Sequence, residues 1–538
     1  MKIKSIFLSA VLAATFLTSC TDAYEIDAAD EIVDLNAINN VGDLERAVTG
    51  VYAGIGGQSF IEWSAWFTDE CRKPSSNRGQ GVQVHTWSIN NGTTEPEGYY
   101  FGLYSTINRA NVVLSRIDAV PTLDDSEVDF KEKVRAELLA IRAMAHFDLL
   151  RFFSTSYDNV TALAIPIVDR PIVFEKLPRN TVGEVLEFVN NDLSLAHTTL
   201  TELSDNTDVT RITPLGVQAL RARIALYSKN YEQAITFAQE VVSAVPLAAN
   251  PTQYLDIWTD AGDAEVVFEL KRVTGNAQVG RVFRDVNGDV FFNVSNDLFN
   301  QFTSTDLRRQ VGALIETGST LDNIRVGKYS GPASNYGLAD IKLFRVAEMY
   351  LILAEAHALK AAPDFVAGEG FINQLRASRR LAPTALPNVS FASQQDAITK
   401  ILDERRRELA FEGHRFFDLK RFNLGINRLD SDVLLNTFAQ TLVGPFYSYF
   451  PWLFSNNFSS FCMFFTSINF SEIKLFKLTS LAFKASLNCF SWFFKICSFL
   501  NSSFSTSFCF FCKSFSITRI GFIFSIWSSI FLIFSNSF

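Results

Sequence analysis

Six charged residues close together near residue 410 are the part of the chain most suggestive of chemistry: Arg405, Arg406, Arg407, Glu408, Glu412 and Arg415. Glu408 and Glu412 are four residues apart, so a helix would place both carboxylates on one face, where they could act as a general acid and base. The same spacing suits structural ion pairs with arginines on the same or neighbouring helices. We favour ion pairs, and we interpret in the same way four charged residues that lie among apolar ones: Arg142, Arg345, Glu348 and Glu355.

Sequence signals for metal, nucleotide or covalent chemistry are weak. The five histidines include no pair four residues apart. The segment DVNGD (285–289) resembles the start of a calcium loop, but the twelfth loop position, which requires a glutamate, is Asn296, and we interpret the segment as a turn. Cys71 is the only cysteine between residues 21 and 440, and no activating His and Asn pattern surrounds it. We therefore predict no catalytic residue, no metal and no cofactor.

The charge balance narrows the class of partner. Residues 21–440 contain 56 Asp and Glu against 40 Lys and Arg, so the body of the protein is acidic. This balance argues against nucleic acid as a partner. The 538 residues are enough for one large domain or several small ones.

The positions of the apolar residues predict a mainly α-helical body. Apolar side chains recur every three or four positions in a series of segments, which indicates amphipathic helices. Thr181 followed by Glu184 is a capping box that marks the start of one of them. The predicted helical segments are 43–55, 99–118, 132–153, 181–200, 213–245, 343–359, 368–380 and 393–422.

The segment 213–245 predicts two helices that pack as an antiparallel pair. It is interrupted at Ser228-Lys229-Asn230, and small residues line the expected contact between its halves. This pattern resembles a tetratricopeptide unit, and a looser copy spans 347–376. Ordinary helix packing remains an alternative. Irregular segments separate the helices: 56–98 is rich in Gly, Asn and Thr, and 265–329 contains short strand-like runs such as EVVFELK.

The N-terminus reads as a secretory signal that ends in a lipidation site. Two lysines precede an apolar run too short to span a membrane. Leu17-Thr18-Ser19-Cys20 resembles a bacterial lipobox, in which Cys20 would carry the acyl chains that anchor the protein in a membrane. An ordinary secretory signal that happens to end in cysteine is the alternative. Acidic residues follow Cys20, which favours the outer membrane.

Several motifs, in this order along the chain, resemble the SusD/RagB family. They are the lipobox, the helix with Tyr104, Asn108 and Asn111, AIPIV (164–168), PRNTVGEV (178–185), ALRARIALYSKNYEQA, RVAEMYLILAEA, INQLRASRR and ERRRELAFEGHRFFDLKR (404–421). The last motif is long and specific. The resemblance covers about residues 20–430.

The resemblance implies a fold, a function and a partner. Members of this family are surface lipoproteins of the outer membrane, built on tetratricopeptide-like helix pairs, with a binding face made of irregular loops. They bind nutrients, usually glycans or oligosaccharides and in some members peptides, without catalysis. They associate with a SusC-like TonB-dependent transporter, which receives the ligand.

Candidate ligand-binding residues lie in two irregular segments. Flat aromatic rings can stack on the apolar faces of sugars, while Asn and Arg can bind hydroxyl groups. Within 56–98, these groups are Trp63, Trp66, Trp87, Arg72, Asn77 and Asn90. In the family, a second segment, before Lys328-Tyr329 in this chain, also contributes to the binding face. There the resemblance implies Phe291, Phe292 and Asn293.

The last part of the chain has a different composition. Residues 441–538 contain 24 of the 51 Phe but 1 of the 57 acidic residues, and the closing motifs that the family resemblance implies are missing. A membrane segment at 520–538 and a Phe/Ser-rich appendage are two interpretations of this tail. A third is antisense translation, because the opposite strand of Glu and Lys codons encodes Phe; the composition favours it. We predict no fold for the tail.

The domain organisation follows from these boundaries. We predict a signal peptide at 1–19, a lipid-anchored tether at 20–40, a SusD-like nutrient-binding domain at 41–435 and a Phe/Ser-rich tail at 441–538 that is non-native or antisense-derived. A tetratricopeptide-like adaptor that binds only proteins is the rival function. A glycosidase would need two carboxylates facing a cleft.

Overall fold

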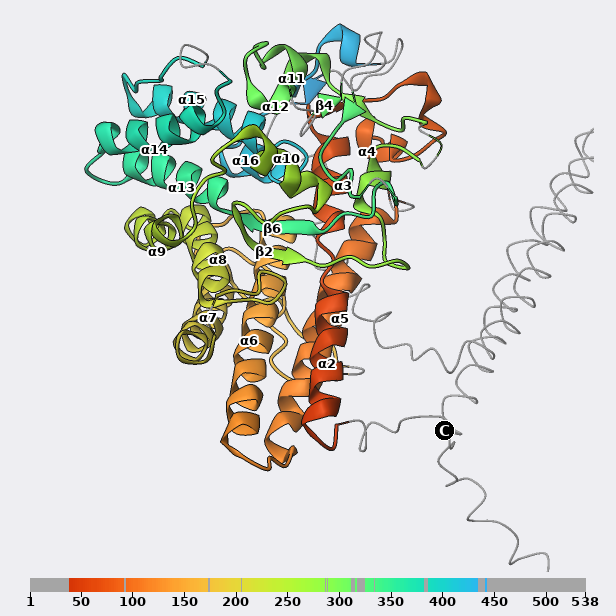
Figure 1. The fold of residues 1–538 in the computed structure, drawn as a ribbon, viewed down its shortest axis with the longest axis vertical. Helices are drawn as coiled ribbons and strands as arrows, with labels where there is room; N and C mark the ends of the chain where they lie inside the picture. Colours follow the sequence, from red (N-terminus) through yellow and green to blue (C-terminus); the bar gives the residue numbers. More distant parts are fainter. Residues whose placement is uncertain are drawn as a thin grey trace, which may run out of the picture. The chain divides into compact units, whose positions relative to one another are not determined.

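The longest helices form where apolar residues recur at helical spacing behind a polar cap. In the computed structural model, α2 (Val41–Gly54), α5 (Glu95–Arg116) and α6 (Asp125–Phe153) lie side by side (Figure 1). The side chains of Asn40 and Asp124 accept hydrogen bonds from the first turns of α2 and α6. The structure describes residues 38–442 except 91–92, 173–174, 205, 286, 288, 311–314, 317–324, 333, 382–385 and 434–440. Cys20, the signal and tether, and the tail beyond residue 442 therefore lie outside the described residues.

The remaining long helices pack largely as neighbouring antiparallel pairs. The predicted pair at 213–245 is confirmed as α8 and α9, separated at Ser228-Lys229-Asn230, and α13 and α14 form the second pair. Thr181 and Glu184 form the predicted capping box at the start of α7. The helices are α7 (Val182–Leu203), α8 (Pro214–Tyr227), α9 (Tyr231–Ala244), α10 (Pro251–Thr259), α13 (Val346–Leu359), α14 (Phe365–Ser378), α15 (Gln394–Glu408) and α16 (Arg415–Arg421).

Short antiparallel ladders join segments that are far apart in the sequence. EVVFELK forms β2 (Val266–Leu270), as predicted, and pairs with β6 (Ile341–Arg345) between the helical regions (Figure 1). The other strands are β1 (Cys71–Arg72) with β3 (Asn293–Val294), β4 (Ile315–Glu316) with β5 (Arg325–Val326), and β7 (Ile426–Asn427) with β8 (Thr441–Leu442). Leu442 in β8 is buried, so the ordered body continues to this residue. The mainly α-helical fold class is confirmed.

Most of the smaller helical elements lie in the two irregular segments, whereas η4 follows α5 and η7 follows β7. They are α3 (Gln58–Phe67), η3 (Ser75–Asn77), α4 (Val82–His85), η4 (Ile117–Ala119), η5 (Val279–Val282), α11 (Asn296–Asn300), α12 (Leu307–Gln310) and η7 (Asp430–Asp432). Among the described residues, no helix combines the length and apolar character needed to cross a membrane.

Several predicted helix boundaries were wrong, among them the following three. The segment 56–98 contains the helix α3, which we did not predict because seven of its ten side chains are buried and the other three are half-buried, so it has no exposed polar face. The predicted helix 393–422 is two helices, α15 and α16, because the backbone turns at Phe411 (φ 64°) and Gly413 (φ 83°). Residues 343–345, predicted as helix, belong to β6.

Candidate functional site

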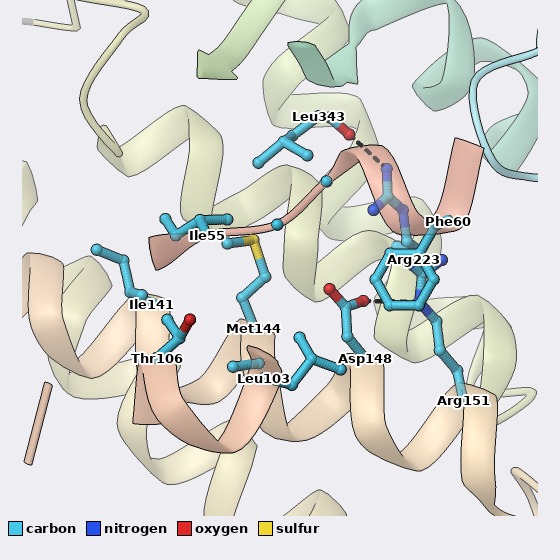
Figure 2. A pocket seen from close by; sticks show the side chains of 13 residues that line it. Ile55, Phe60, Leu103, Thr106, Ile141, Met144, Asp148, Arg151, Arg223 and Leu343 are labelled. Carbon is cyan, nitrogen blue, oxygen red and sulfur yellow. Dashed lines mark hydrogen bonds and ion pairs between the residues drawn. The ribbon is translucent and has the colours of Figure 1, made fainter. Parts of the chain in front are cut away.

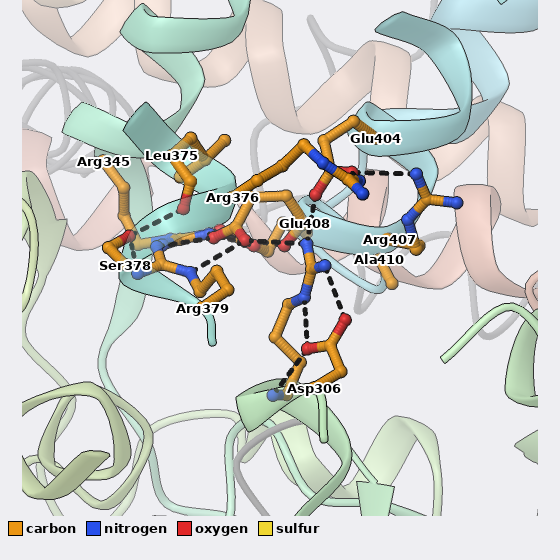
Figure 3. Close-up of polar contacts among 12 residues, drawn as sticks. Asp306, Arg345, Leu375, Arg376, Ser378, Arg379, Glu404, Arg407, Glu408 and Ala410 are labelled. Atoms are coloured by element: carbon orange, nitrogen blue, oxygen red, sulfur yellow. Dashed lines mark hydrogen bonds and ion pairs between the residues drawn. The ribbon is translucent and has the colours of Figure 1, made fainter. Parts of the chain in front are cut away.

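The charged cluster near residue 410 is a buried ion-pair network. The Glu408 carboxylate accepts hydrogen bonds from Arg308, Arg345 and Arg379, at 3.0–3.2 Å. These four side chains are at most 2% exposed. Figure 3 shows Arg345, Arg379 and Glu408 within the network. Burial alone would raise the pKa of Glu408, but the three guanidinium groups hold it well below its ordinary value. Glu408 is therefore a structural anion rather than a proton donor.

The other charged residues singled out in the sequence are also paired. Glu412 binds Lys328 at 2.6 Å and Arg345 at 2.7 Å. Seven further residues form ion pairs: Arg142 with Asp192, Glu348 with Arg223, Glu355 with Arg421, Arg405 with Asp418, Arg406 with Asp297, Arg407 with Glu404, and Arg415 with Asp69. The interpretation as structural ion pairs is confirmed.

The segment DVNGD is a turn that an arginine holds closed. The Asp285 Oδ1 atom accepts the backbone N–H groups of Asn287 and Asp289 at 2.9 Å, and Arg78 pairs with both aspartates. The guanidinium of Arg78 thus occupies the position of a counter-ion. In the described part of the chain, no group of three or more His, Cys, Asp or Glu side chains is arranged to hold a metal ion.

A cavity between α2, α5, α6 and β6 is too small for a sugar. It has a volume of about 30 Å³, room for about one water molecule. Figure 2 shows Ile55, Met144 and Leu343 on its apolar wall and the Asp148–Arg151 ion pair at one end. A ligand larger than water would therefore have to bind outside this cavity.

Three loop segments that are distant in the sequence meet on one part of the body. We call them the loop cluster, defined as the described residues within 68–90, 278–296 and 330–338. The ladder between β1 and β3 joins the first two segments, and Asn77 Nδ2 donates to the Phe291 carbonyl oxygen at 2.7 Å. The Arg284 Cζ atom lies 3.7 Å from the centre of the Tyr336 ring, and this contact joins the third segment to the second. The two segments predicted to hold ligand residues are therefore neighbours in space.

Five of the predicted ligand residues are buried inside this region. Trp63 is 1% exposed and packs against Phe67, Phe152 and Phe416. Trp66 stacks on Phe292 with ring centroids 5.6 Å apart. The side chains of five predicted ligand residues offer almost no exposed surface to a ligand. We therefore reassign them from the ligand site to the core: Trp63, Trp66, Asn77, Phe292 and Asn293.

Four predicted ligand residues remain accessible. Arg72, Trp87 and Phe291 are half-buried and Asn90 is exposed. Trp87 donates its Nε1–H to the Phe67 carbonyl oxygen at 2.9 Å, which orients its ring at the end of α3. Ligand contact by these four side chains stays a prediction.

The sequence interpretation missed one part of the loop cluster. Asn335 and Tyr336 are half-buried, and the Gln278 Nε2 atom donates to the Asn335 side chain at 3.0 Å. Their segment, SGPASNYGL, is a turn rich in Gly, Ser and Asn that contains one aromatic residue. The same composition that identified 56–98 could have identified it.

Glu70, in the loop cluster, accepts hydrogen bonds from two uncharged donors, one of which follows the helix of Glu408. Its carboxyl group accepts the Phe411 N–H at 2.8 Å and the Ser64 hydroxyl at 2.9 Å. Burial raises the pKa of Glu70 from 4.5 to about 7, against these hydrogen bonds. The neighbouring Asp69 has the opposite shift, because Arg406 and Arg415 overcome the effect of burial and lower its pKa.

Replacing Glu70 by glutamine is expected to remove a pH-dependent loss of stability. Because the folded pKa lies above the unfolded value, the protonated carboxyl stabilises the fold below about pH 4.5, and this contribution is lost as the pH rises through about 7. Glu70→Gln should therefore gain about 3 kcal/mol relative to the native chain between pH 5 and pH 8. Urea unfolding at both pH values measures this gain. Glu45→Gln, an exposed change on α2, is the control, and an equal gain in both variants would contradict the prediction.

Comparison with known proteins decides the family. The family model described as "Starch-binding associating with outer membrane" matches residues 32–226, and the model described as "SusD family" matches residues 293–469. Together they cover more than half of the chain. This chain belongs to the SusD/RagB family. The SusD family match extends to residue 469, past residue 435, where we place the end of the nutrient-binding domain, so that boundary stays a prediction.

Individual relatives of this SusD-family chain are similar along most of their length. SusD-like protein P38 of Formosa agariphila is 23% identical over 78% of this chain and 92% of its own. A putative sugar binding protein from Bacteroides vulgatus has a TM-score of 0.65 and 24% identity, over 77% of this chain and 95% of its own. A SusD-like carbohydrate binding protein from the same species has a TM-score of 0.65 and 20% identity, over 81% of this chain and 99% of its own. The TM-scores show that the fold of this chain is shared with these two structures.

Proposed function

We propose that this SusD-family protein captures a glycan at the cell surface and passes it to a SusC-like TonB-dependent transporter. The observation that carries the proposal is the loop cluster, which brings half-buried aromatic rings together with polar side chains. Trp87, Phe291 and Tyr336 supply rings, while Asn90 and Asn335 supply amides. Aromatic rings with nearby hydrogen-bonding groups suit sugars, which have apolar ring faces and hydroxyl edges.

The membrane side of the proposal rests on the family and on Cys20. One matching family is described as associating with the outer membrane, and the lipobox at residues 17–20 would supply a lipid anchor there. Acylation of Cys20 and exposure at the cell surface are therefore proposals that fit together. A transporter gene beside this one would support the proposed partner.

Binding without catalysis fits the chemistry of the charged groups. Glu408 and Glu412, the pair with suitable spacing for acid and base, are both buried in ion pairs with Arg345. A glycosidase needs two carboxylates that reach a substrate. We propose that the protein binds its ligand unchanged.

Affinity gel electrophoresis of the full chain tests this function. Gels would contain amylopectin, xylan, laminarin or alginate, and a parallel titration would use a peptide library. We expect at least one glycan to slow the migration of the protein, or a peptide to bind if this member follows the peptide-binding minority. If no glycan or peptide binds, the protein-binding adaptor becomes the better account of the helix pairs.

A further inference from the structure

Trp87 has a backbone conformation that bulky residues rarely adopt. Its φ angle is 54°, in the left-handed region. A bulky side chain there costs about 1–2 kcal/mol and persists only where the surroundings hold it. The structure must therefore contain groups that fix the segment around Trp87.

Arg428 makes the most extensive contacts with this segment. Its guanidinium group lies 4.4 Å from the centre of the Trp87 ring, close enough for a cation–π interaction. The Arg428 Nη1 atom also donates to the His85 carbonyl oxygen at 2.6 Å, at the end of α4. One side chain thus holds both the ring of Trp87 and the backbone two residues before it.

The same guanidinium binds the end of α3. It donates to the carbonyl oxygens of Phe67 at 2.8 Å, Thr68 at 2.8 and 3.0 Å, and Trp66 at 3.2 Å. The last carbonyls of a helix have no partner within the helix and carry partial negative charge. Arg428 therefore joins the ends of α3 and α4 at the point where Trp87 emerges.

A second residue of the same segment fixes the other side of the loop cluster. The Asp432 carboxylate accepts the N–H of Asn296 at 2.6 Å and of Asp297 at 3.1 Å, at the start of α11. Residues 428–432 thus contact the first and second segments of the loop cluster together. Residues 428–432, which directly follow β7, therefore link these two loop segments to each other.

Arg428 is also held at an energetic cost. It is 1% exposed, and burial lowers its pKa to about 10. A buried cation is retained only where its contacts offset the loss of hydration. Its contacts are divided between the end of α3 and the segment that carries Trp87.

We infer that Arg428 is a positioning residue that holds Trp87 and the adjoining loop in the arrangement in which the ligand is received. The inference that this arrangement serves a ligand rests on the proposed function. The positioning itself does not, because it can be measured without any ligand. Arg428 acts through Trp87 and the ends of α3 and α4, and no direct contact with a sugar is required.

Fluorine NMR of the full chain labelled with 5-fluorotryptophan tests this role. The Trp87 resonance is assigned by its disappearance in Trp87→Phe. In Arg428→Met, which keeps an unbranched apolar stem but removes the donors and the charge, we expect the Trp87 resonance to move by more than its line width or to broaden. Arg428→Lys retains the charge and some donors, so it should give a smaller change of the same kind.

Lys420→Met is the matched control. Lys420 is a half-buried cation that also donates to backbone carbonyl oxygens, at 2.8 and 3.0 Å, but these belong to Arg151 and Phe152 at the end of α6. We expect this variant to lose stability while its Trp87 resonance stays in place. An unchanged Trp87 resonance in folded Arg428→Met overturns the inference. If Arg428→Met does not fold, an unchanged resonance in Arg428→Lys overturns it instead.

Failure of this test differs from failure of the proposed function. A protein that binds no glycan or peptide but shows the shifted resonance retains the positioning role and loses the proposed function. A protein that binds a glycan with an unchanged resonance retains the function and loses the role of Arg428.

Discussion

Replacing Glu408 by alanine is expected to lower the free energy of unfolding by about 5 kcal/mol or more. The substitution leaves Arg308, Arg345 and Arg379 without a shared anion in a region that is at most 2% exposed. Removing one partner from a buried ion pair costs about 3–5 kcal/mol, and here three cations lose a partner at once. Glu265, Glu404 and Asp306 retain contacts with the arginines and should prevent a still larger loss. Equilibrium unfolding in urea measures the change.

An exposed ion pair of similar geometry provides the control. Glu175 binds Arg170 through both carboxylate oxygens, at 2.7 and 2.8 Å, but both side chains are largely exposed. Such surface pairs contribute about 0–1 kcal/mol. Glu175→Ala should therefore have little effect, and similar losses in the two variants would show that burial does not determine the strength of the network. Glu408→Gln, which keeps the shape of the side chain, is measurable if the alanine variant does not fold.

Ending the chain after Gly425 is expected to abolish cooperative unfolding, whereas ending it after Leu442 is expected to leave the midpoint unchanged. The shorter chain loses Arg428, Asp432 and the ladder between β7 and β8. It therefore also loses the hydrogen bonds that the Arg428 guanidinium donates and the Asp432 carboxylate accepts. Bonds to charged groups are worth about 1.5–3 kcal/mol each, so the loss should exceed about 5 kcal/mol. The longer chain retains all of these contacts.

Thermal unfolding of the three chains, including the full one, checks this prediction. It tests the proposal that residues 443–538 add nothing to the body, although the family match extends to residue 469. A lower midpoint for the chain ending at Leu442 would show that part of the tail belongs to the fold. A cooperative transition in the chain ending at Gly425 would show that the Arg428 segment is not required for folding.

Local sequence signals were sufficient to predict helix ends that are set by residues only a few positions apart. The capping box of Thr181 and Glu184 and the interruption at Ser228-Lys229-Asn230 act within a few residues, so both were predicted correctly. The helix α3 was missed because burial on nearly all sides removes the polar stripe that reveals a helix. The turn between α15 and α16 depends on positive φ angles at Phe411 and Gly413, and a phenylalanine in a sequence does not predict a positive φ angle.

The candidate site was predicted by region but only partly by residue. Residue type identified the tryptophans, but the rings that bury Trp63 come from Phe152 and Phe416, which are distant in the sequence. Arg428 gave no signal at all, because a single arginine in INRLD resembles any surface residue. Its importance depends on carbonyl oxygens at the ends of α3 and α4, which only the folded chain brings within reach.

The most direct test of ligand capture by the loop cluster is the affinity of Trp87→Ala for the glycan that binds the native chain. Phe237→Ala is the control, since Phe237 is also a half-buried ring beneath an arginine, at 4.1 Å from Arg221, but it lies on α9. Isothermal titration should show at least an approximately tenfold weaker affinity for Trp87→Ala, equivalent to about 1.4 kcal/mol, and an unchanged affinity for Phe237→Ala. Native affinity in a folded Trp87→Ala protein would contradict the account.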